Sequence, residues 1–130
     1  MPGSIFYLDK SEIREGKLQE VKAAIADLVA FLDSNVPRAV SYGIYLDEGG
    51  TQMTVVQIHP DSASLEHHMK VGAPEFAKFK DLVKLQTIEV YGEPSRELLG
   101  RLTEKARMLG GDAIAVNGLE AGFERFRLAS

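Results

Sequence analysis

The chain has 130 residues, of which 45% are hydrophobic, so its length and composition fit one globular domain. Its 15 basic and 19 acidic residues give a net charge of −4, which argues against a nucleic-acid binder that needs a basic face. The absence of cysteine excludes disulfide frameworks, zinc–thiolate sites, thiolate nucleophiles and iron–sulfur clusters.

The first two predicted elements are a strand and a helix. Residues 5–8 (IFYL) are apolar, branched or aromatic, which predicts a strand that continues in a polar, frayed form toward Ile13. Gly16 marks a break, and Pro37 ends any helix that begins after it. Apolar residues recur every three or four positions over residues 17–34, which predicts an amphipathic helix. Its apolar stripe consists of Leu18, Val21, Ile25, Leu28 and Leu32.

A β-hairpin is the next predicted element. Residues 39–47 (AVSYGIYLD) and 52–59 (QMTVVQIH) are rich in residues that favour strands, and they flank the short segment 48–51 (EGGT). Two such runs separated by a Gly-Gly turn are typical of a hairpin.

Helical segments and a fourth strand follow the hairpin. A helix capped by Asp61 or Ser62 has an inward side formed by Leu65, His68 and Met69. Gly72 and Pro74 are expected to break this helix. A separate helical stretch then follows, with one side formed by Phe76, Phe79 and Val83. Residues 86–91 (QTIEVY) predict the fourth strand.

The remaining residues predict a third helix and a short tail. Ser95 is a typical N-cap for a helix over residues 96–109, and the glycines at 110–111 are typical of a helix end. The apolar side of this helix consists of Leu98, Leu99, Leu102, Ala106 and Leu109. A short apolar piece over residues 113–116 predicts a further strand. An alternating piece predicts a second one around Phe123, Phe126 and Leu128.

The order of these elements predicts the fold class. Strand, helix, strand, strand, helix and strand form a ferredoxin-like α+β sandwich, an antiparallel four-stranded sheet with helices on one face. We expect a single domain over residues 1–130, with a core at about 4–92 and a C-terminal helix and strand extension at about 95–128. Both sheet faces look largely apolar, which favours a homodimer that covers the open face. Alternatively, the third helix and the tail cover part of this face.

Few polar side chains lie within the apolar segments, and His68 is the most informative. It is expected to point from its helix toward the sheet, whereas His67 is one step round the helix and more exposed to solvent. Because neighbouring helical residues diverge by ~100°, the two histidines are not expected to share a metal ion. A cavity lined by Tyr, His, Met and Phe suits a flat aromatic or lipophilic ligand. The side chains expected to bind this ligand are Met53, His59, Met69, Phe76, Phe79 and Tyr91.

The same residues also have ordinary structural interpretations. A histidine on a helix face is usually a satisfied structural group, and strand tyrosines are commonly core residues with a hydroxyl at the rim. For His59, which precedes Pro60, a hydrogen bond that fixes the loop is weighed above catalysis. The scattered acidic residues are interpreted as solvated helix faces. The sequence contains no phosphate-binding loop, nucleophile elbow or dinucleotide fingerprint.

Several segments within residues 4–92 carry a family resemblance. They are Ile5-Phe6-Tyr7 leading to Gly16-Lys17, residues 59–69 (HPDSASLEHHM), residues 74–79 (PEFAKF) and residues 88–92 (IEVYG). Together they resemble the antibiotic-biosynthesis-monooxygenase (ABM)-like proteins of the dimeric α+β barrel superfamily. The family pattern of a helical His followed by a phenylalanine-rich turn fits best on His68, Phe76 and Phe79.

The resemblance implies a homodimer with one pocket per subunit. Some members oxidise polycyclic aromatic substrates with molecular oxygen and without a cofactor, and they stabilise the substrate anion with Tyr, Asn, Trp or Arg side chains. This chain has no Trp, and its asparagines at positions 35 and 117 lie outside the core strands. The haem-degrading members use Asn, Trp and His together. Since this chain supplies only the His, the resemblance does not favour haem degradation.

Three functions are weighed from these observations. The first is a cofactor-independent monooxygenase or an isomerase acting on an aromatic or quinone-like compound, with His68 as acid or base and with Tyr7 and Tyr42 orienting the substrate. No cofactor and no metal are expected for it. The second is a non-catalytic dimer, possessing the same pocket, that binds a hydrophobic ligand or responds to stress. The third, an RNA-binding module, is disfavoured by the acidic charge balance.

The expected location of the chain follows from two further sequence features. No apolar stretch has the length of a membrane span, and the first residues lack a secretion signal. We therefore expect a cytoplasmic protein with no membrane or nucleic-acid partner.

Overall fold

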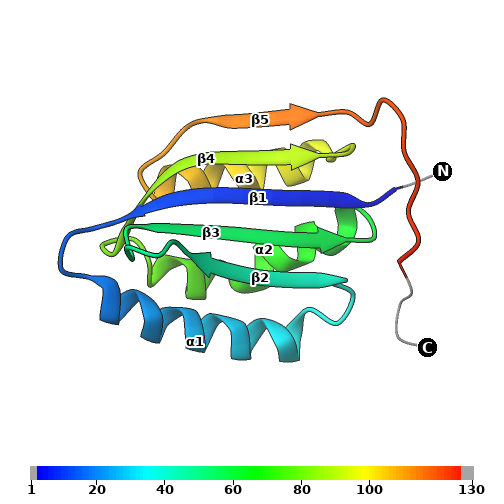
Figure 1. The fold of residues 1–130 in the computed structure, drawn as a ribbon. Helices are drawn as coiled ribbons and strands as arrows, with labels where there is room; N and C mark the ends of the chain where they lie inside the picture. The colour runs from blue at the N-terminus through cyan, green and yellow to red at the C-terminus, as the bar shows by residue number, and fades with distance from the viewer. Residues whose placement is uncertain (1–2, 127–130) are drawn as a thin grey trace.

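The computed structural model describes residues 3–126, which form eight elements (Figure 1). In chain order they are β1 (Ile5–Ile13), α1 (Leu18–Asn35), β2 (Ser41–Leu46), β3 (Gln52–His59), α2 (Ser62–Ala77), β4 (Val83–Tyr91), α3 (Arg96–Met108) and β5 (Ile114–Asn117). In this part of the chain, no helix is long and apolar enough to cross a membrane.

One sheet and one layer of helices make up the fold. The strand order is β2-β3-β1-β4-β5, antiparallel throughout except for the parallel pair β4 and β5. All three helices lie on the same face of the sheet, with α2 between α1 and α3 (Figure 1). The first six elements thus form the expected ferredoxin-like sandwich. The helix α3 and the strand β5 extend it at one edge, as the sequence predicts.

The central strand β1 is longer and more regular than the sequence predicts. It pairs with both β3 and β4 as far as Glu12 and Ile13, so the expectation of a frayed end is wrong. Neighbours on both sides satisfy its backbone groups, which allows polar residues in a central strand. Its side chains alternate between the helix layer and the open face, and the buried set is Ile5, Tyr7, Asp9, Ser11 and Ile13.

The segment after α2 also differs from the prediction. The helix α2 continues through Gly72 and Pro74 to Ala77 without the expected break. Proline's fixed backbone angle fits a helix, so Pro74 near the C-terminal end costs one hydrogen bond and does not end the helix. Gly72 serves packing, because a Cβ there would lie 2.7 Å from Phe76 Cζ. There is no separate helix up to Val83, which is the first residue of β4.

An irregularity in β4 explains why its start is hard to recognise. The register between β1 and β4 shifts between Lys10 and Ser11, so that Lys10 pairs with Thr87 but Ser11 pairs with Leu85. This β-bulge changes which alternate residues of β4 point inward. Val83 and Leu85 are buried before it, and Ile88 and Val90 after it. Consequently β4 lacks one continuous period-two pattern.

The helix α3 has the caps that the sequence predicts. The Ser95 side chain accepts a hydrogen bond from the Leu98 backbone N–H, and the Ser95 backbone N–H donates to Ser62 Oγ at the start of α2. Gly110 follows the helix with φ of +84°, a left-handed conformation that glycine adopts without strain. These contacts place the apolar stripe of α3 on α2 and β4.

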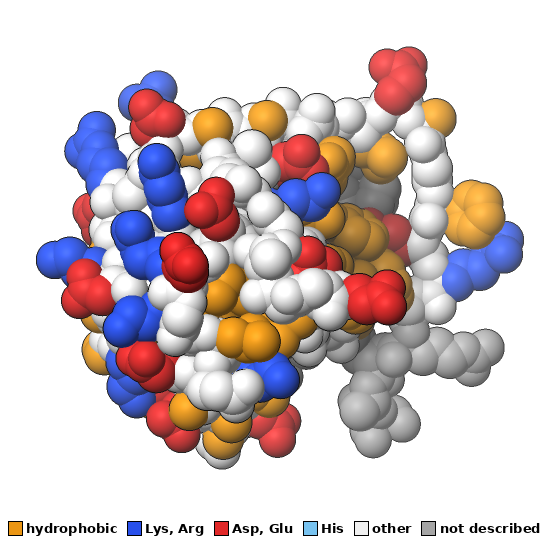
Figure 2. Space-filling view, turned by 60° about the vertical axis from the view of Figure 1, so that its left-hand side comes forward, with side chains coloured by type: hydrophobic (Ala, Val, Ile, Leu, Met, Phe, Trp, Pro, Cys, Tyr) orange, Lys and Arg blue, Asp and Glu red, His pale blue; other side chains and the backbone are white. Residues whose placement is uncertain are grey.

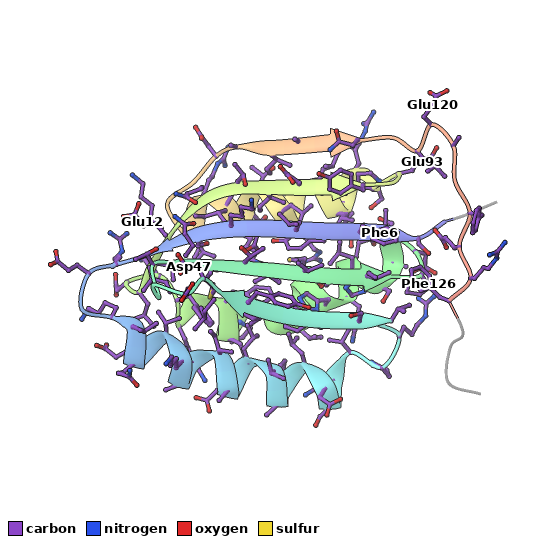
Figure 3. The ribbon with its side chains drawn as sticks, viewed as in Figure 1. Phe6, Glu12, Asp47, Glu93, Glu120 and Phe126 are labelled. Carbon is purple, nitrogen blue, oxygen red and sulfur yellow. The ribbon has the colours of Figure 1, made fainter. Side chains whose placement is uncertain are left out.

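The open face of the sheet is apolar in part. Outward side chains of β1 and β3 include Phe6, Leu8, Val56 and Ile58, which are half-buried. The tail contributes to the cover of this face, since the Phe126 ring lies 5.9 Å from the Phe6 ring between centroids (Figure 3). Phe123 and Phe126 lie outside any strand, and Leu128 falls outside the described residues.

Charge and hydrophobicity are distributed unevenly over the surface. Figure 2 shows acidic and basic side chains interspersed over one side of the molecule and hydrophobic side chains gathered in a hollow beside the tail. A cavity of about 540 Å³ lies there, between the tail and the ends of β1 and β4. Its walls include acidic side chains at Glu93, Glu120 and Glu124.

Candidate functional site

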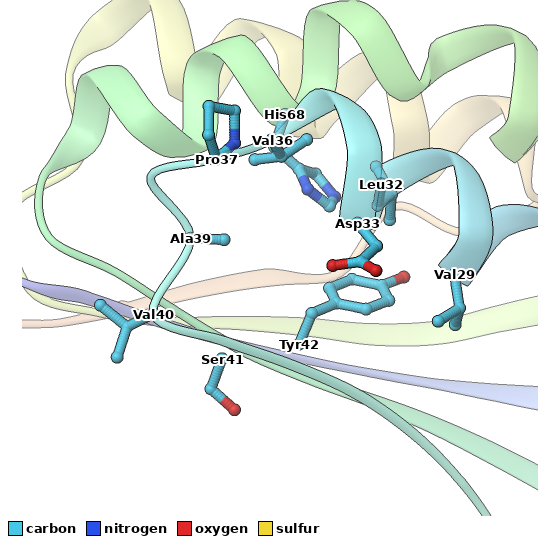
Figure 4. Close-up of a pocket in the computed structure, with 10 residues that line it drawn as sticks. All are labelled: Val29, Leu32, Asp33, Val36, Pro37, Ala39, Val40, Ser41, Tyr42 and His68. Carbon is cyan, nitrogen blue, oxygen red and sulfur yellow. The ribbon is translucent and has the colours of Figure 1, made fainter. Parts of the chain in front are cut away.

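A cavity of about 290 Å³ opens between α1, β2 and α2, and we call it the outer cavity. Its polar groups are few: Asp33 and Ser41 lie near solvent, and Tyr42 and His68 lie deeper (Figure 4). Its walls are otherwise formed by the apolar side chains of Val29, Leu32, Val36, Pro37, Ala39 and Val40. An apolar pocket with a few polar groups at its inner end is typical of a site for a small lipophilic molecule.

His68 is the polar group at the inner end of the outer cavity. Its side chain is 1% exposed, and its Nε2 has no hydrogen-bond partner among the described residues. Burial, followed by the positive charge of Lys105, holds the pKa of His68 well below its usual range. The imidazole is therefore neutral at physiological pH, with a nitrogen available to accept or donate a hydrogen bond.

Aromatic rings surround His68 on three sides. Its ring centroid lies 5.4 Å from those of Tyr42 and His59 and 5.6 Å from that of Phe76. Figure 4 shows the imidazole directed toward the Tyr42 ring. Burial, assisted by the charge of Asp9, raises the pKa of Tyr42, so its hydroxyl stays protonated. This arrangement confirms that His68 points from α2 toward the sheet.

His59 belongs to a buried hydrogen-bond relay. Its Nδ1 lies 2.8 Å from Ser64 Oγ, and its Nε2 lies 2.7 Å from Gln57 Oε1. Since an amide oxygen only accepts, His59 donates a hydrogen bond from Nε2 to Gln57. At Nδ1 it accepts a hydrogen bond from the Ser64 hydroxyl. Burial lowers the pKa of His59 to about 4. His59 thus fixes the start of α2 against β3, in agreement with the structural role weighed from the sequence.

A second cluster of buried polar side chains lies deeper, beneath α3. Lys105 Nζ is 3.0 Å from Asp9 Oδ2 and donates to the Tyr7 hydroxyl oxygen at 2.9 Å. The Tyr7 hydroxyl in turn donates to Asp9 Oδ2. The same ammonium lies 4.5 Å from the centre of the Phe76 ring, within range of a cation–π interaction. Burial, together with the Asp9 carboxylate, raises the pKa of Tyr7 well above its usual value. We call Tyr7, Asp9 and Lys105 the buried triad.

The structure brings together most of the residues that the sequence singles out. His68 has Tyr42, His59 and Phe76 as neighbours. Tyr7 is connected to Phe76 through Lys105, whose ammonium lies over both rings. Three further expected ligand contacts line smaller spaces next to this group, namely Met53, Met69 and Phe79. Tyr91 does not join them. It is 42% exposed on the open face and lines the cavity beside the tail.

Sequence reasoning missed Asp9, Ser11, Gln57 and Lys105, although two patterns could have found three of them. Lys105 lies on the apolar stripe of α3, at the spacing that Leu98, Leu102 and Leu109 define. A regular strand up to Ile13 places Asp9 and Ser11 on the same face as Tyr7. The expectation of a frayed, polar end to the first strand is therefore wrong for Asp9, which is 2% exposed.

No metal site is assigned. Within residues 3–126, no three His, Asp or Glu side chains lie close enough together to hold a metal ion.

Comparison with known proteins identifies the fold. No protein-family model and no curated protein matches the chain. Among solved structures, MupZ from Pseudomonas fluorescens is similar over 98% of this chain and 99% of its own, with a TM-score of 0.73 and 22% identity. This likeness extends over α3 and the tail.

Two further solved structures are similar over a shorter part. The cofactor-independent oxygenase SnoaB from Streptomyces nogalater matches 72% of this chain and 95% of its own, with a TM-score of 0.60 and 10% identity. A protein of Caulobacter crescentus assigned as an antibiotic biosynthesis monooxygenase matches 68% and 88%, with a TM-score of 0.62 and 18% identity. The chain thus has the α+β fold of the ABM-like structures, as the sequence resemblance implies.

Proposed function

We propose that the chain is a cofactor-independent monooxygenase that acts on an aromatic or quinone-like molecule in the outer cavity. The observation that carries this proposal is the neutral, buried imidazole of His68, whose unpartnered Nε2 belongs to a side chain in the wall of an apolar cavity. The fold that the chain shares with SnoaB, a cofactor-independent oxygenase, supports it. Fold similarity alone assigns no activity, so the proposal depends on the site.

In the proposed reaction the protein moves a proton and the substrate supplies the electrons. His68 Nε2 takes a proton from an activated methylene of a phenolic substrate, and the resulting anion reduces O2. The methylene becomes a carbonyl with one oxygen atom, and the second oxygen leaves with both methylene hydrogens as water. The low pKa of His68 is compatible with this step, because the anion and the imidazolium form together and pair in an apolar environment.

Oxygen consumption by purified, metal-stripped protein tests this function. We expect protein-dependent uptake with 1,8-dihydroxyanthrone, and a His68→Gln variant should lose activity by a factor on the order of 100 or more. His67→Gln is the matched control, because His67 is exposed and its Nε2 donates a hydrogen bond to the Asn35 backbone carbonyl oxygen at the surface. No uptake above the uncatalysed rate, or full activity in His68→Gln, would contradict the proposal and favour a ligand-binding protein.

We also propose that a second copy of the chain covers the open face of the sheet. The proposal is supported by the apolar side chains of β1 and β3 on that face and by the exposure of Tyr45, at 62%, beside them. Contiguous apolar surface of this kind is typical of interfaces. The tail meets this face at Phe6.

A charge in the middle of the open face should separate the two copies. We expect light scattering to give a dimer mass for the unmodified chain and a monomer mass for Val56→Glu, because the carboxylate would be buried without a partner. Ala26→Glu, on the exposed side of α1, should stay dimeric. A monomeric unmodified chain, or a dimeric Val56→Glu, would rule out this interface.

A further inference from the structure

A small space of about 20 Å³ has Tyr42 as one of its walls. We call it the inner chamber. Its polar walls are Asp9, Ser11, Tyr42 and Lys105, and Phe76 and other apolar side chains form the rest. This volume has room for one oxygen atom, since about 10–15 Å³ suffices for a water molecule.

The polar groups of the inner chamber have hydrogen-bonding capacity that the protein does not use. Ser11 Oγ is buried and has no partner among the described residues. The hydrogen bonds of Asp9 within that part of the chain involve Oδ2 alone, which leaves Oδ1. Lys105 Nζ carries three donors, and two polar acceptors are present, Asp9 Oδ2 and the Tyr7 oxygen. A buried hydroxyl without a partner is costly, so Ser11 Oγ indicates an occupant that pairs with it, and Asp9 Oδ1 and Lys105 Nζ can pair with the same occupant.

The mixture of donors and acceptors selects the kind of group. A carbonyl oxygen could accept from Lys105 but could not donate to Asp9 Oδ1. An anion would meet the Asp9 carboxylate, and a cation would meet the Lys105 ammonium, at short range in an apolar region. A neutral hydroxyl both donates and accepts, so it satisfies the acidic and the basic side together.

The inner chamber and the outer cavity share one wall. Tyr42 lines both of them. No hydrogen bond to a described residue fixes its hydroxyl, so packing alone holds the ring in place. Rotation of this ring would join the two spaces into one site with His68 on one side and the buried triad on the other.

We propose that the inner chamber binds a single hydroxyl group of a phenolic or enolic ligand whose apolar body occupies the outer cavity. The proposal rests on the proposed function in one respect, namely that the same ligand contacts His68. It adds the position of one ligand hydroxyl, which donates to Asp9 and accepts from Ser11 or Lys105. Unsubstituted aromatic hydrocarbons leave these groups unpaired and are disfavoured.

Two probes of the same shape test this proposal by calorimetric titration. The protein should bind 2-naphthol at least about tenfold more tightly than 2-fluoronaphthalene, which cannot donate a hydrogen bond. In Ser11→Ala this preference should fall about three- to tenfold, the effect of one lost hydrogen bond. The melting temperature of Ser11→Ala should stay equal or rise, because the hydroxyl that is removed has no partner in the protein.

The controls separate this proposal from general effects and from the oxygenase activity. Ser34→Ala, on the exposed side of α1, should keep the full preference for 2-naphthol. Asp9→Asn should reduce it, since the amide offers a weaker acceptor than a carboxylate. Equal binding of both probes, no binding of either, or an unchanged preference in Ser11→Ala and Asp9→Asn would overturn the proposal. A preference for 2-naphthol without oxygen uptake would support the chamber and contradict the monooxygenase.

Discussion

Replacing Lys105 with Met is expected to lower the free energy of unfolding by about 3–5 kcal/mol. The Lys105 and Asp9 side chains are 8% and 3% exposed, and their charged atoms lie 3.0 Å apart. Without the ammonium, the Asp9 carboxylate stays buried, and the Tyr7 hydroxyl is its one remaining partner among residues 3–126. Urea unfolding followed by circular dichroism measures the loss. Arg101→Met, which removes a half-exposed ion pair with Glu97 on the same helix, should cost less than about 1 kcal/mol.

The double variant Asp9→Asn/Lys105→Met distinguishes a buried charge from lost packing. With both charges removed, neither position leaves an unpaired ion in the interior, and Tyr7 can donate to the amide oxygen. We expect the double variant to be more stable than Lys105→Met alone, with a coupling energy of about 1–3 kcal/mol in the cycle. Additive losses would show that Lys105 contributes through its aliphatic chain and its contact with Phe76, and not through the ion pair.

Local patterns predict most of this fold because several elements carry redundant signals. The helix α1 has a regular apolar stripe, and α3 has both a serine cap and a glycine end. The β2–β3 hairpin has a Gly-Gly turn, in which Gly50 adopts φ of +68°. In each case the local preference and the tertiary packing agree, which is the condition for reading structure from sequence.

The errors arise where packing between distant segments overrides a local rule. Pro74 and Gly72 suggest a helix break, yet the packing of Phe76 across Gly72 favours a continuous helix. The bulge in β4 shifts the inward set of residues, and only the pairing with β1 reveals it. A polar segment such as residues 9–12 looks frayed until strands on both sides are known to pair with it.

Part of the candidate site can likewise be predicted from local patterns, and part of it cannot. His68 and its aromatic neighbours can be predicted, because each lies on an apolar stripe or a strand face. The partners of Tyr7 cannot be found from β1 alone, since Lys105 is 98 residues away from Tyr7 in the chain. The contact between Lys105 and Tyr7 depends on the packing of α3 beside α2. The helix α3 lies outside the core that carries the family resemblance.

The two buried histidines should make the fold sensitive to mild acid. Burial lowers the pKa of His59 to about 4 and that of His68 well below its usual range. In the unfolded chain both groups titrate near pH 6.5, so below that pH the unfolded state binds protons that the folded state does not. The stability that the two neutral histidines contribute is therefore fully present above about pH 6.5. It is lost as the pH falls toward 4. The shift of His59 alone corresponds to about 3 kcal/mol at pH 4, and His68 adds to it.

The diagnostic interval lies between pH 6.5 and 5, above the range in which most carboxylates titrate. Urea unfolding at intervals of half a pH unit measures the slope of the free energy there. Because a glutamine does not titrate in this range, His59→Gln should flatten the slope even where it lowers stability at pH 7. Ser34→Ala, an exposed substitution on α1 that removes no titratable group, should leave the slope unchanged. A flat profile in the unmodified chain would mean that His59 and His68 bind protons without unfolding, which requires water to reach both rings. In that case His68 would be protonated at mildly acidic pH in the folded protein and could not act there as the base of the proposed reaction.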